Sequence, residues 1–577
     1  MEVTTLRKFW RHSGFRFGFV FAGASILLAL VLYYPALRGG FVFDDVPLRL
    51  ADGARPHSIA GWYSRQRPVL MFSYGLNQVL LGASPASFRI GNTLIHAFNA
   101  CLVFLAIRRL LAKADWPGFP GRFAALCGSL IFLVHPLQTE SVSYIAGRSE
   151  SLAATFLLLA YVVFLADRRG AISWLRSAAV LALFVLAVKT KENAVSLAGV
   201  LLLTDLMWPC AFSLQGVRRN WRLYALMLPG AAVAAVLIFR MLATAHTAGF
   251  SVANYTWYQY AFTEARAIFE YLQMAAVPIG QALDHDFAPS RTILDHGAVF
   301  YMAILALITG SAIYWRRRYP VACFGFLLFL VLLAPTSTVV PVDDAVVERR
   351  MYLPLLGLIL IGCEAARRWR PSRPAAVALV TMMAITFGSY CYARNRFWGN
   401  PDLLIAQAAQ DARYNPRPLL NVAEAMIRRN RCDLAISYLD RAERILPGSY
   451  YVHAIRGRAL GCLGHPEEAL VHLEIAARIQ PCSDVFQWIG LVYGQMGRLA
   501  EAGESLRKAV ELDPGSATAH GSLGLWYETV GDDRGAEREY AASLAIEPHD
   551  RSPWTGLERL RQRKMVQIPP EPFELLP

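Results

Sequence analysis

The 577-residue sequence has few charged residues and lacks several common signatures. Only 17% of its residues are Asp, Glu, Lys or Arg. Its nine cysteines form no Cys-x-x-Cys pair and no zinc-ligand spacing, so the sequence gives no support for a zinc site. No stretch combines basic and aromatic residues in the way that indicates a nucleic-acid surface, and nucleic acid is therefore not an expected partner.

Long apolar runs take the place of these signatures. The chain is 55% hydrophobic with a mean hydropathy of +0.34, which is too apolar for an ordinary soluble protein. Runs of roughly 17–25 residues, long enough to cross a bilayer, recur from about residue 17 to about residue 391. From about residue 400 the chain becomes polar and helical in period, which predicts a membrane domain (1–395), a linker (396–414) and a soluble domain. No small-residue cleavage site follows the first run, so we expect a retained first span.

Basic clusters predict the orientation of the spans, because short cytoplasmic loops are enriched in Lys and Arg. The clusters are Arg108-Arg109-Lys113, Arg168-Arg169, Arg218-Arg219-Arg222, Arg316-Arg317-Arg318 and Arg367-Arg368-Arg370. About eleven spans place all of them on the cytoplasmic side: 17–36, 91–111, 123–139, 151–166, 174–188, 194–209, 223–243, 296–314, 320–335, 351–366 and 374–391. The N-terminus is then cytoplasmic and the C-terminal domain extracytoplasmic. The charged segment 264–282 is interpreted as a re-entrant or interfacial helix. If this segment instead crosses the membrane, the orientation of every later span and loop is reversed.

The C-terminal domain has an internal repeat. Prolines 447, 481, 514 and 548 are spaced by 34, 33 and 34 residues, and alanines 435, 469, 502 and 536 repeat with the same steps. This period is typical of tetratricopeptide repeats, in which pairs of helices stack into a superhelix with a concave binding surface. We expect about four repeats over 415–550, followed by a capping helix and tail over 551–577. Cys432, Cys462 and Cys482 lie in this region, and a disulfide among them is left open by the sequence.

Charged residues gather in the loops on the predicted outward face. These loops contain Asp44-Asp45, "HPLQTESVSYIAGRSE" (His135 to Glu150), "KTKEN" (Lys189 to Asn193), "DHDF" (Asp284 to Phe287) and "VDDAVVERRMYLP" (Val342 to Pro354). Charges beside a bilayer are costly and indicate function by default. Several loops of one face would together assemble an active site at the membrane surface.

Each charged motif also has a structural interpretation. Asp44-Asp45 is either a helix stop facing water or a carboxylate pair in which repulsion raises one pKa and prepares a base. Lys191 and Glu192 are either snorkelling residues at a span end or site residues. The "DHDF" residues favour a turn over a metal site. Arg349 and Arg350 are either interfacial anchors or phosphate ligands, since arginine binds phosphate by bidentate hydrogen bonds.

The order of these motifs resembles that of the transmembrane and tetratricopeptide-repeat O-mannosyltransferases, membrane enzymes of the C-type glycosyltransferase fold. "GGFVFDDV" is similar to the acidic motif that opens the family. The other matching positions are Arg67, Pro68, Asn77, Asn92 and His96; His135, Pro136, Glu140, Gly147 and Arg148; Lys191 and Glu192; and Glu348, Arg349, Tyr352, Leu353 and Pro354. The sequence departs from many family members in having only about four repeats.

The resemblance implies an all-α protein that transfers a sugar, such as mannose, from a polyprenyl-phosphate donor to a hydroxyl group of a protein or cell-envelope acceptor. By this resemblance Asp45 or Asp44 is the catalytic base, with Asp45 preferred. Arg349, with Arg350 and Lys191, holds the donor phosphate. The residues that complete the pocket are Glu140, Arg148, Glu192, His135 and Glu348. No cofactor is certain beyond the lipid-phosphate sugar as donor substrate, and the need for a divalent metal is left open without support from the residues. The repeats recruit the acceptor or other protein partners.

Three alternatives remain at this level. The chain is a transferase acting on lipid A or a glycan, a non-catalytic membrane-anchored scaffold for envelope assembly, or a transporter. The transporter is disfavoured because the charges collect on one face instead of near the middle of the spans. The expected location is the bacterial inner membrane, with many spans.

Overall fold

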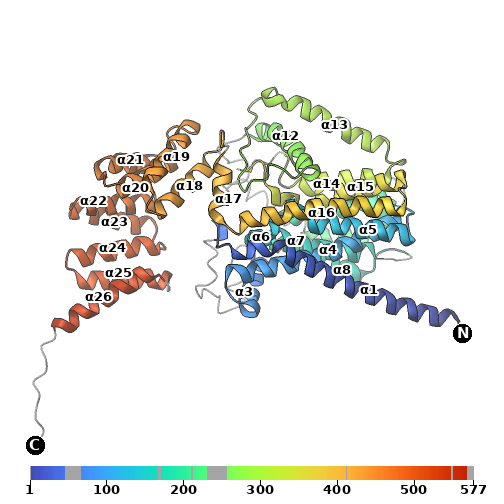
Figure 1. The fold of residues 1–577 in the computed structure, drawn as a ribbon, viewed down its shortest axis with the longest axis horizontal. Coiled ribbons are helices and arrows are strands. Elements are labelled where there is room, and N and C mark those ends of the chain that lie inside the picture. The colour runs from blue at the N-terminus through green and yellow to red at the C-terminus, as the bar shows by residue number, and fades with distance from the viewer. Residues whose placement is uncertain are drawn as a thin grey trace, which may run out of the picture. The chain divides into compact units, whose positions relative to one another are not determined.

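The computed structural model of the chain describes residues 2–45, 67–166, 170–208, 212–230, 256–338, 340–342, 344–410, 412–547 and 550–567. These residues form helices and no strand (Figure 1). The chain divides into two compact units, Met1–Leu404 and Ile405–Pro577. We call them the membrane unit and the repeat unit.

The membrane unit is built from apolar helices joined by short 3-10 turns. Its α-helices are α1 (Glu2–Tyr33), α3 (Pro68–Leu81), α4 (Pro85–Lys113), α5 (Gly118–Val134), α6 (Thr139–Ser143), α7 (Arg148–Leu165), α8 (Trp174–Thr190), α9 (Ser196–Met207), α10 (Gln215–Arg219), α12 (Trp257–Ala276), α13 (Ala298–Tyr314), α14 (Pro320–Leu333), α15 (Leu355–Trp369) and α16 (Arg373–Trp398). Its 3-10 helices are η1 (Tyr34–Arg38), η2 (Phe43–Asp45), η3 (Pro136–Gln138), η4 (Glu192–Val195), η5 (Asp295–Gly297) and η6 (Glu348–Met351).

Five helical segments of the described chain are long and apolar enough to cross a membrane: Phe17–Arg38, Pro85–Lys113, Arg148–Leu165, Asp295–Tyr314 and Arg373–Trp398. A sixth is added if α5 and the segment Pro136–Ser143, bent by 54° from each other, count as one broken span. Four further predicted spans correspond to helices of 12 to 17 residues, α8, α9, α14 and α15. The segment predicted to span 223–243 extends outside the described residues. The protein is a multi-pass membrane protein, and the count of eleven spans stays a prediction.

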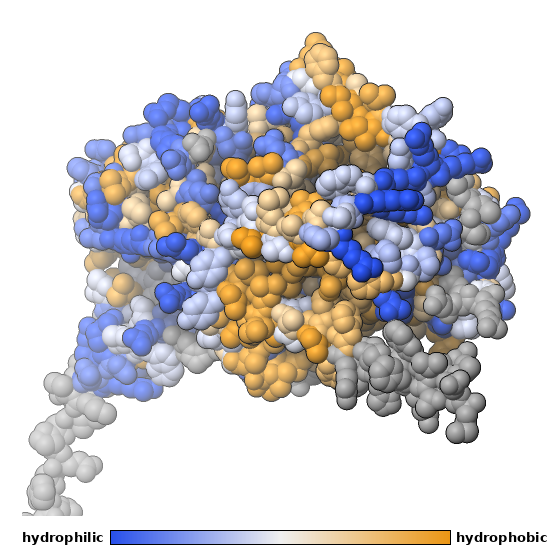
Figure 2. All heavy atoms as spheres, turned by 45° about the vertical axis from the view of Figure 1, so that its right-hand side comes forward, coloured by the Kyte–Doolittle hydropathy of each residue, from blue (hydrophilic) through white to orange (hydrophobic). Residues whose placement is uncertain are grey.

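The core of the membrane unit lies where α4, α5, α7, α14 and α15 pack together (Figure 1). Other helices keep apolar side chains on the surface: Phe19 of α1 is 65% exposed, Phe300 of α13 70% and Ile385 of α16 65%. On the face shown in Figure 2, a broad apolar patch lies in the lower middle of the view. In a chain with spanning helices such a surface faces lipid, where it costs no hydration free energy.

The repeat unit is a series of short helices. They are α18 (Arg417–Arg428), α19 (Cys432–Ile445), α20 (Tyr450–Cys462), α21 (Pro466–Ile479), α22 (Ser483–Gln495), α23 (Leu499–Leu512), α24 (Ala517–Thr529), α25 (Asp533–Ile546) and α26 (Arg551–Gln567), while α17 (Pro401–Gln410) crosses the boundary between the units. A repeated glycine lets neighbouring helices touch, since a Cβ on Gly490 would lie 2.6 Å from Leu506 Cγ. Of the three cysteines, Cys432 pairs with Cys462 in a disulfide and Cys482 stays reduced.

Candidate functional site

The two adjacent aspartates after the first span have different surroundings. Asp45 is fully buried, and its Oδ1 accepts a 2.7 Å hydrogen bond from the Ala146 N–H. Asp44 is exposed, and its backbone N–H donates to the Tyr144 hydroxyl at 3.0 Å. Burial raises the pKa of the Asp45 carboxyl to about 7, although the Ala146 N–H and the Arg89 charge act against this. From the sequence, repulsion between the two carboxylates was expected to raise the pKa of one of them. This cause is wrong, because the pKa of Asp45 is raised by its burial.

Arg89 of α4 fixes the loop that carries the aspartates. Its buried guanidinium donates to the carbonyl oxygens of Gly39, Gly40 (2.7 Å) and Ser143 (2.8 Å). The loop that follows η1 is thereby joined to the end of α6. Sequence reasoning missed Arg89, although an arginine inside a long apolar run was a visible signal.

His135 lies where α5 ends and η3 begins. The His135 Nδ1 accepts from the Leu137 N–H at 3.2 Å, so Nε2 carries the proton and donates to the Ala275 carbonyl at 3.0 Å. The two ring nitrogens therefore connect the bend between α5 and η3 to Ala275 of α12. The predicted pocket residue His135 is thus a buried structural contact in its neutral form.

Arg148, also predicted to line the pocket, is buried in a separate network. Its guanidinium donates to Asn92 Oδ1 at 2.5 Å, to Asn77 Oδ1 at 2.8 Å and to the Phe88 carbonyl at 2.9 Å. It also stacks over the Tyr74 ring at 4.7 Å. These contacts join α3, α4 and α7. Only 1% of Arg148 is exposed, so its side chain is not accessible to a substrate.

Arg349 of η6 pairs with Glu140 of α6. The Nη1 of Arg349 lies 2.5 Å from Glu140 Oε1, and the Arg349 backbone N–H donates to Glu140 Oε2 at 2.8 Å. Glu140 is buried, whereas the Arg349 side chain is 25% exposed and its guanidinium lies 5.9 Å from the Tyr144 ring centroid. Burial lowers the pKa of Arg349, but the attraction of Glu140 outweighs it and keeps the arginine charged.

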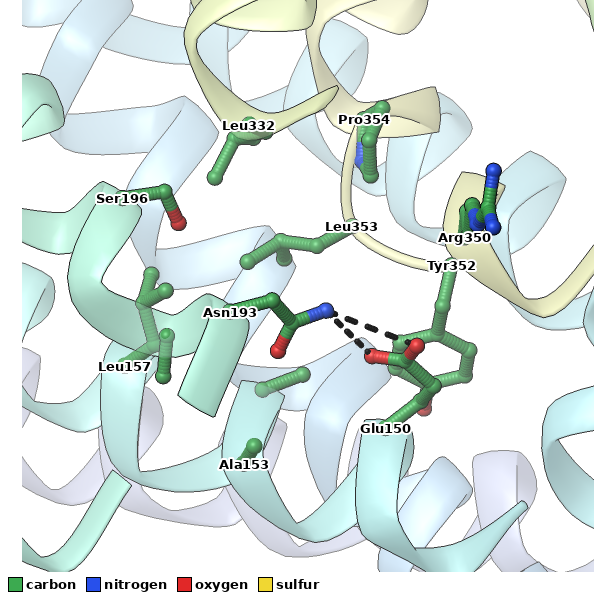
Figure 3. A pocket seen from close by; sticks show the side chains of 12 residues that line it. Glu150, Ala153, Leu157, Asn193, Ser196, Leu332, Arg350, Tyr352, Leu353 and Pro354 are labelled. Carbon is green, nitrogen blue, oxygen red and sulfur yellow. Dashed lines mark hydrogen bonds between the residues drawn. The ribbon is translucent and has the colours of Figure 1, made fainter. Parts of the chain in front are cut away.

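Lys191, at the end of α8, pairs with Glu150 of α7. The Lys191 Nζ lies 2.5 Å from Glu150 Oε1. In Figure 3 Asn193 points toward Glu150, and its Nδ2 donates to Glu150 Oε2 at 3.2 Å. Glu150, Asn193, Arg350 and apolar side chains such as Leu353 border a cavity of about 30 Å³ (Figure 3). A volume of this size holds a water molecule and no sugar. Glu150 was not singled out from the sequence, although it lies two residues after Arg148.

Glu192 pairs with Arg67 at the surface. Arg67 Nη2 lies 2.8 Å and Nε 3.2 Å from Glu192 Oε2, and both side chains are partly exposed. Burial and the charges of Arg349 and Arg67 lower the pKa of Lys191, while Glu150 acts against them. The three cations Arg67, Lys191 and Arg349 are therefore electrostatic neighbours.

Two further predicted residues are committed to the protein interior. Arg350 donates to the carbonyl oxygens of Asp344 and Ala345 at 2.5 and 2.9 Å, and its side chain is 7% exposed. The buried Glu348 accepts from Gln281 Nε2 at 2.7 Å and lies 3.2 Å from His285 Nε2. Both residues hold loops around η6.

The structure thus separates the ten predicted site residues into two groups. Asp44, Glu140, Lys191, Glu192 and Arg349 belong to one cluster with exposed and buried members, to which Arg67, Tyr144 and Glu150 are added. We call it the outward cluster, after the orientation that the basic residues of the sequence predict. Asp45, His135, Arg148, Glu348 and Arg350 lie behind it in buried networks. Over the described ranges, no three His, Cys, Asp or Glu side chains form a group that could hold a metal ion.

The architecture defines a polytopic membrane protein with C-terminal tetratricopeptide repeats. A tetratricopeptide-repeat family model matches residues 483–516. The mouse protein O-mannosyl-transferase TMTC3 is 21% identical over 93% of this chain and 65% of its own length. The mouse TMTC1 and Drosophila melanogaster Tmtc1 are 34% and 31% identical over 34% and 33% of this chain, each over 23% of its own length.

These relatives confirm the resemblance inferred from the motifs, and they are homologues of the chain. The chain spans about 65% of the length of the mouse TMTC3 that it matches. Among solved structures, a tetratricopeptide protein of Thermus thermophilus is 21% identical over 31% of this chain and 96% of its own, with a TM-score of 0.27.

Proposed function

We propose that the protein transfers a sugar from a lipid-phosphate donor to a hydroxyl group of a protein acceptor on the extracytoplasmic face. The observation that carries the proposal is the outward cluster: the exposed Asp44 contacts Tyr144, the Arg349 guanidinium lies 5.9 Å from the Tyr144 ring, and Arg349, Lys191 and Arg67 are electrostatic neighbours. A transfer from a phosphate needs both: a base for the acceptor and positive charge for the leaving group. The names of the relatives, protein O-mannosyl-transferases, favour mannose and a protein acceptor.

Asp44 is the proposed base. Its carboxylate is exposed beside Tyr144, whereas the carboxylate of Asp45 is enclosed and bonded to backbone N–H groups. The pKa of Asp45, about 7, would suit a base, but a base must first reach the proton that it removes. We therefore prefer Asp44 over the residue favoured by the sequence.

The cations Arg349, Lys191 and Arg67 are proposed to bind the donor phosphate. Glu140 uses Nη1 of Arg349, and the guanidinium is still partly exposed, so it can bind a phosphate without losing its carboxylate partner. In the reaction the acceptor oxygen bonds to the sugar C1, the bond from C1 to the phosphate oxygen breaks, and the acceptor proton passes to Asp44. The lipid phosphate leaves with the electron pair, and the cations stabilise its charge.

The repeat unit is proposed to recruit the acceptor or partner proteins. Tetratricopeptide repeats present concave surfaces for proteins and bring no reacting group of their own. In this arrangement the membrane unit performs the transfer and the repeat unit supplies selectivity.

The test measures transfer of radiolabelled mannose from polyprenyl-phosphate mannose in membranes that contain the full chain or an Asp44→Asn variant. We expect the variant to lose at least about a hundredfold of the rate, as removal of a general base does, while inserting normally. Asp115→Asn is the matched control, because Asp115 is an exposed aspartate of another loop of the same unit.

Equal transfer by the Asp44→Asn variant and the wild type would refute the role of Asp44 as base. Transfer that persists when Asp44→Asn, Arg349→Gln and Lys191→Gln are combined would refute the site as a whole. A well-inserted wild type that transfers no sugar from any lipid-phosphate donor would favour the scaffold over the enzyme.

A further inference from the structure

A second pocket lies at the ends of two predicted spans. It is lined by Tyr34, Pro35, Arg38, Tyr392, Arg396 and Gly399, and its volume is about 350 Å³. This volume is in the range of small-ligand sites. The first three lining residues belong to η1, which continues the span Phe17–Arg38, and the others lie at the end of the span Arg373–Trp398. The pocket shares no residue with the outward cluster.

The backbone brings the two spans into close contact here. Tyr392, Arg396 and Gly399 are four and three residues apart, so they share one face at the end of α16. A Cβ at Gly399 would lie 2.4 Å from the Pro35 carbonyl oxygen, which a side chain cannot tolerate. Glycine at this position lets η1 pack directly against the end of α16, where both contribute residues to the lining of the pocket.

The pocket is lined by two cations and by no carboxylate. Arg38 and Arg396 are exposed, and neither has a hydrogen-bond or ion-pair partner within the part of the chain that the structure describes. The Arg38 guanidinium lies 5.9 Å from the Tyr34 ring centroid. Cations favour helix C-termini, which both residues occupy, but that effect does not require them to converge on one cavity.

The surroundings of the pocket favour a lipid over a soluble ligand. Tyr34 is 55% and Tyr392 43% exposed, and tyrosine at a span end marks the level of the lipid headgroups. Apolar side chains such as Val31 and Ile385 are exposed further along the same helices, where acyl chains would lie. On the predicted orientation this end of the spans is outward, where basic residues are not needed for topology.

We infer that this pocket binds the phosphate of an anionic phospholipid headgroup. The two guanidinium groups hold the phosphate oxygens by charge-assisted hydrogen bonds, and the tyrosine rings flank the headgroup. The site is independent of the proposed transfer reaction. Because η1 leads directly into the loop of Asp44, the bound lipid also anchors the start of that loop.

The experiment is native mass spectrometry of the full chain in detergent, titrated with phosphatidylglycerol. The test variant combines Arg38→Gln with Arg396→Gln. The control combines Arg317→Gln with Arg370→Gln, which removes the same charge from exposed arginines of other loops. Parallel titrations use phosphatidylcholine, which is zwitterionic, and inorganic phosphate. Melting curves of both variants check that they fold.

We expect the affinity for the first phosphatidylglycerol to fall about tenfold in the Arg38/Arg396 variant and to stay within about twofold in the control. Equal affinity of the wild type and the Arg38/Arg396 variant would overturn the site. Phosphatidylcholine binding as tightly as phosphatidylglycerol would overturn its preference for an anionic lipid. Inorganic phosphate that displaces the lipid at equal concentration would overturn the lipid assignment in favour of a free phosphate.

Discussion

The Asp45→Asn substitution tests how burial acts on the acidic loop. Burial raises the pKa of Asp45 from its ordinary 3.8 to about 7. Between these values the folded protein keeps a proton that the unfolded chain has lost. The stability contributed by the protonated carboxyl is thus fully present below pH 3.8 and is lost as the pH rises to about 7. Above that pH both states are ionised, and no further loss follows.

The magnitude follows from the shift. Each pH unit well inside the window costs about 1.4 kcal/mol, and the slope falls off near pH 7, where the folded carboxyl is half ionised, so the wild type loses about 2.3 kcal/mol from this group between pH 5 and pH 7. Asparagine does not titrate and removes this slope. It also loses the weak hydrogen bond that Asp45 Oδ2 accepts from the Val42 N–H at 3.4 Å, which costs about 1 kcal/mol at every pH. Relative to the wild type, the variant is therefore expected to gain stability as the pH rises, by about 2.6 kcal/mol between pH 5 and pH 8.

The assay follows unfolding of the purified full chain in detergent by tryptophan fluorescence at pH 5, 6, 7 and 8. The measured quantity is the difference in apparent melting temperature between the variant and the wild type. Asp115→Asn provides the control, and its difference should not change with pH. Parallel melting temperatures of Asp45→Asn and the wild type across this range would refute the reasoning, because they would show that Asp45 does not titrate there.

Two other predictions concern residues buried behind the site and in the repeats. Arg148→Met leaves the oxygens of Asn92, Asn77 and Phe88 without their donor. We expect the variant to lose about 3–5 kcal/mol of stability, measured as a large fall in melting temperature and not as a selective loss of transfer. A variant that folds but is inactive would show that Arg148 belongs to the pocket. Replacement of Cys432 and Cys462 by serine removes a crosslink with a sequence separation of 30 and should lower the stability of the repeat unit by about 3–4 kcal/mol. Hydrogen exchange should become faster in α19 and α20, and unchanged exchange would contradict this prediction.

Much of the fold could be predicted from the sequence, because the length of an apolar run and the period of a repeat are local properties. The 34-residue steps of the prolines and alanines predicted the repeats, and apolar runs predicted most helices of the membrane unit. The break at Pro136 was missed: a span was predicted straight through 123–139, whereas α5 ends at Val134 and the next segment is bent by 54°. The apolar run ends at Val134, and the polar His135 together with Pro136 marked the break.

Less of the candidate site could be predicted, because the sequence shows which residues are charged but not which partner each of them contacts. Arg148 and Arg349 are alike in the sequence, as arginines at the edge of apolar runs. Arg148 meets side-chain amides and a carbonyl and is enclosed, whereas Arg349 meets one carboxylate and stays partly exposed. Asp44 and Asp45 are neighbours, yet the 3-10 turn η2 directs one to solvent and the other to a backbone N–H. These differences arise from contacts 56 to 209 residues apart in the chain.

The pairing of each site cation with a carboxylate bears on how a phosphate would bind. A buried cation carries a desolvation cost, which the attraction of Glu140 outweighs for Arg349, so this arginine is charged and held in place before any ligand arrives. For Lys191, burial lowers the pKa and Glu150 acts against this lowering. The two cations differ in what remains after pairing. Arginine has five donors in a planar fork, so Arg349 can hold Glu140 through Nη1 and still present another edge to a phosphate. Lysine is a compact point charge, and Lys191 is largely enclosed with Glu150. Arg349 is therefore the direct phosphate ligand in the proposed mechanism, while Lys191 acts on the same phosphate mainly through its field.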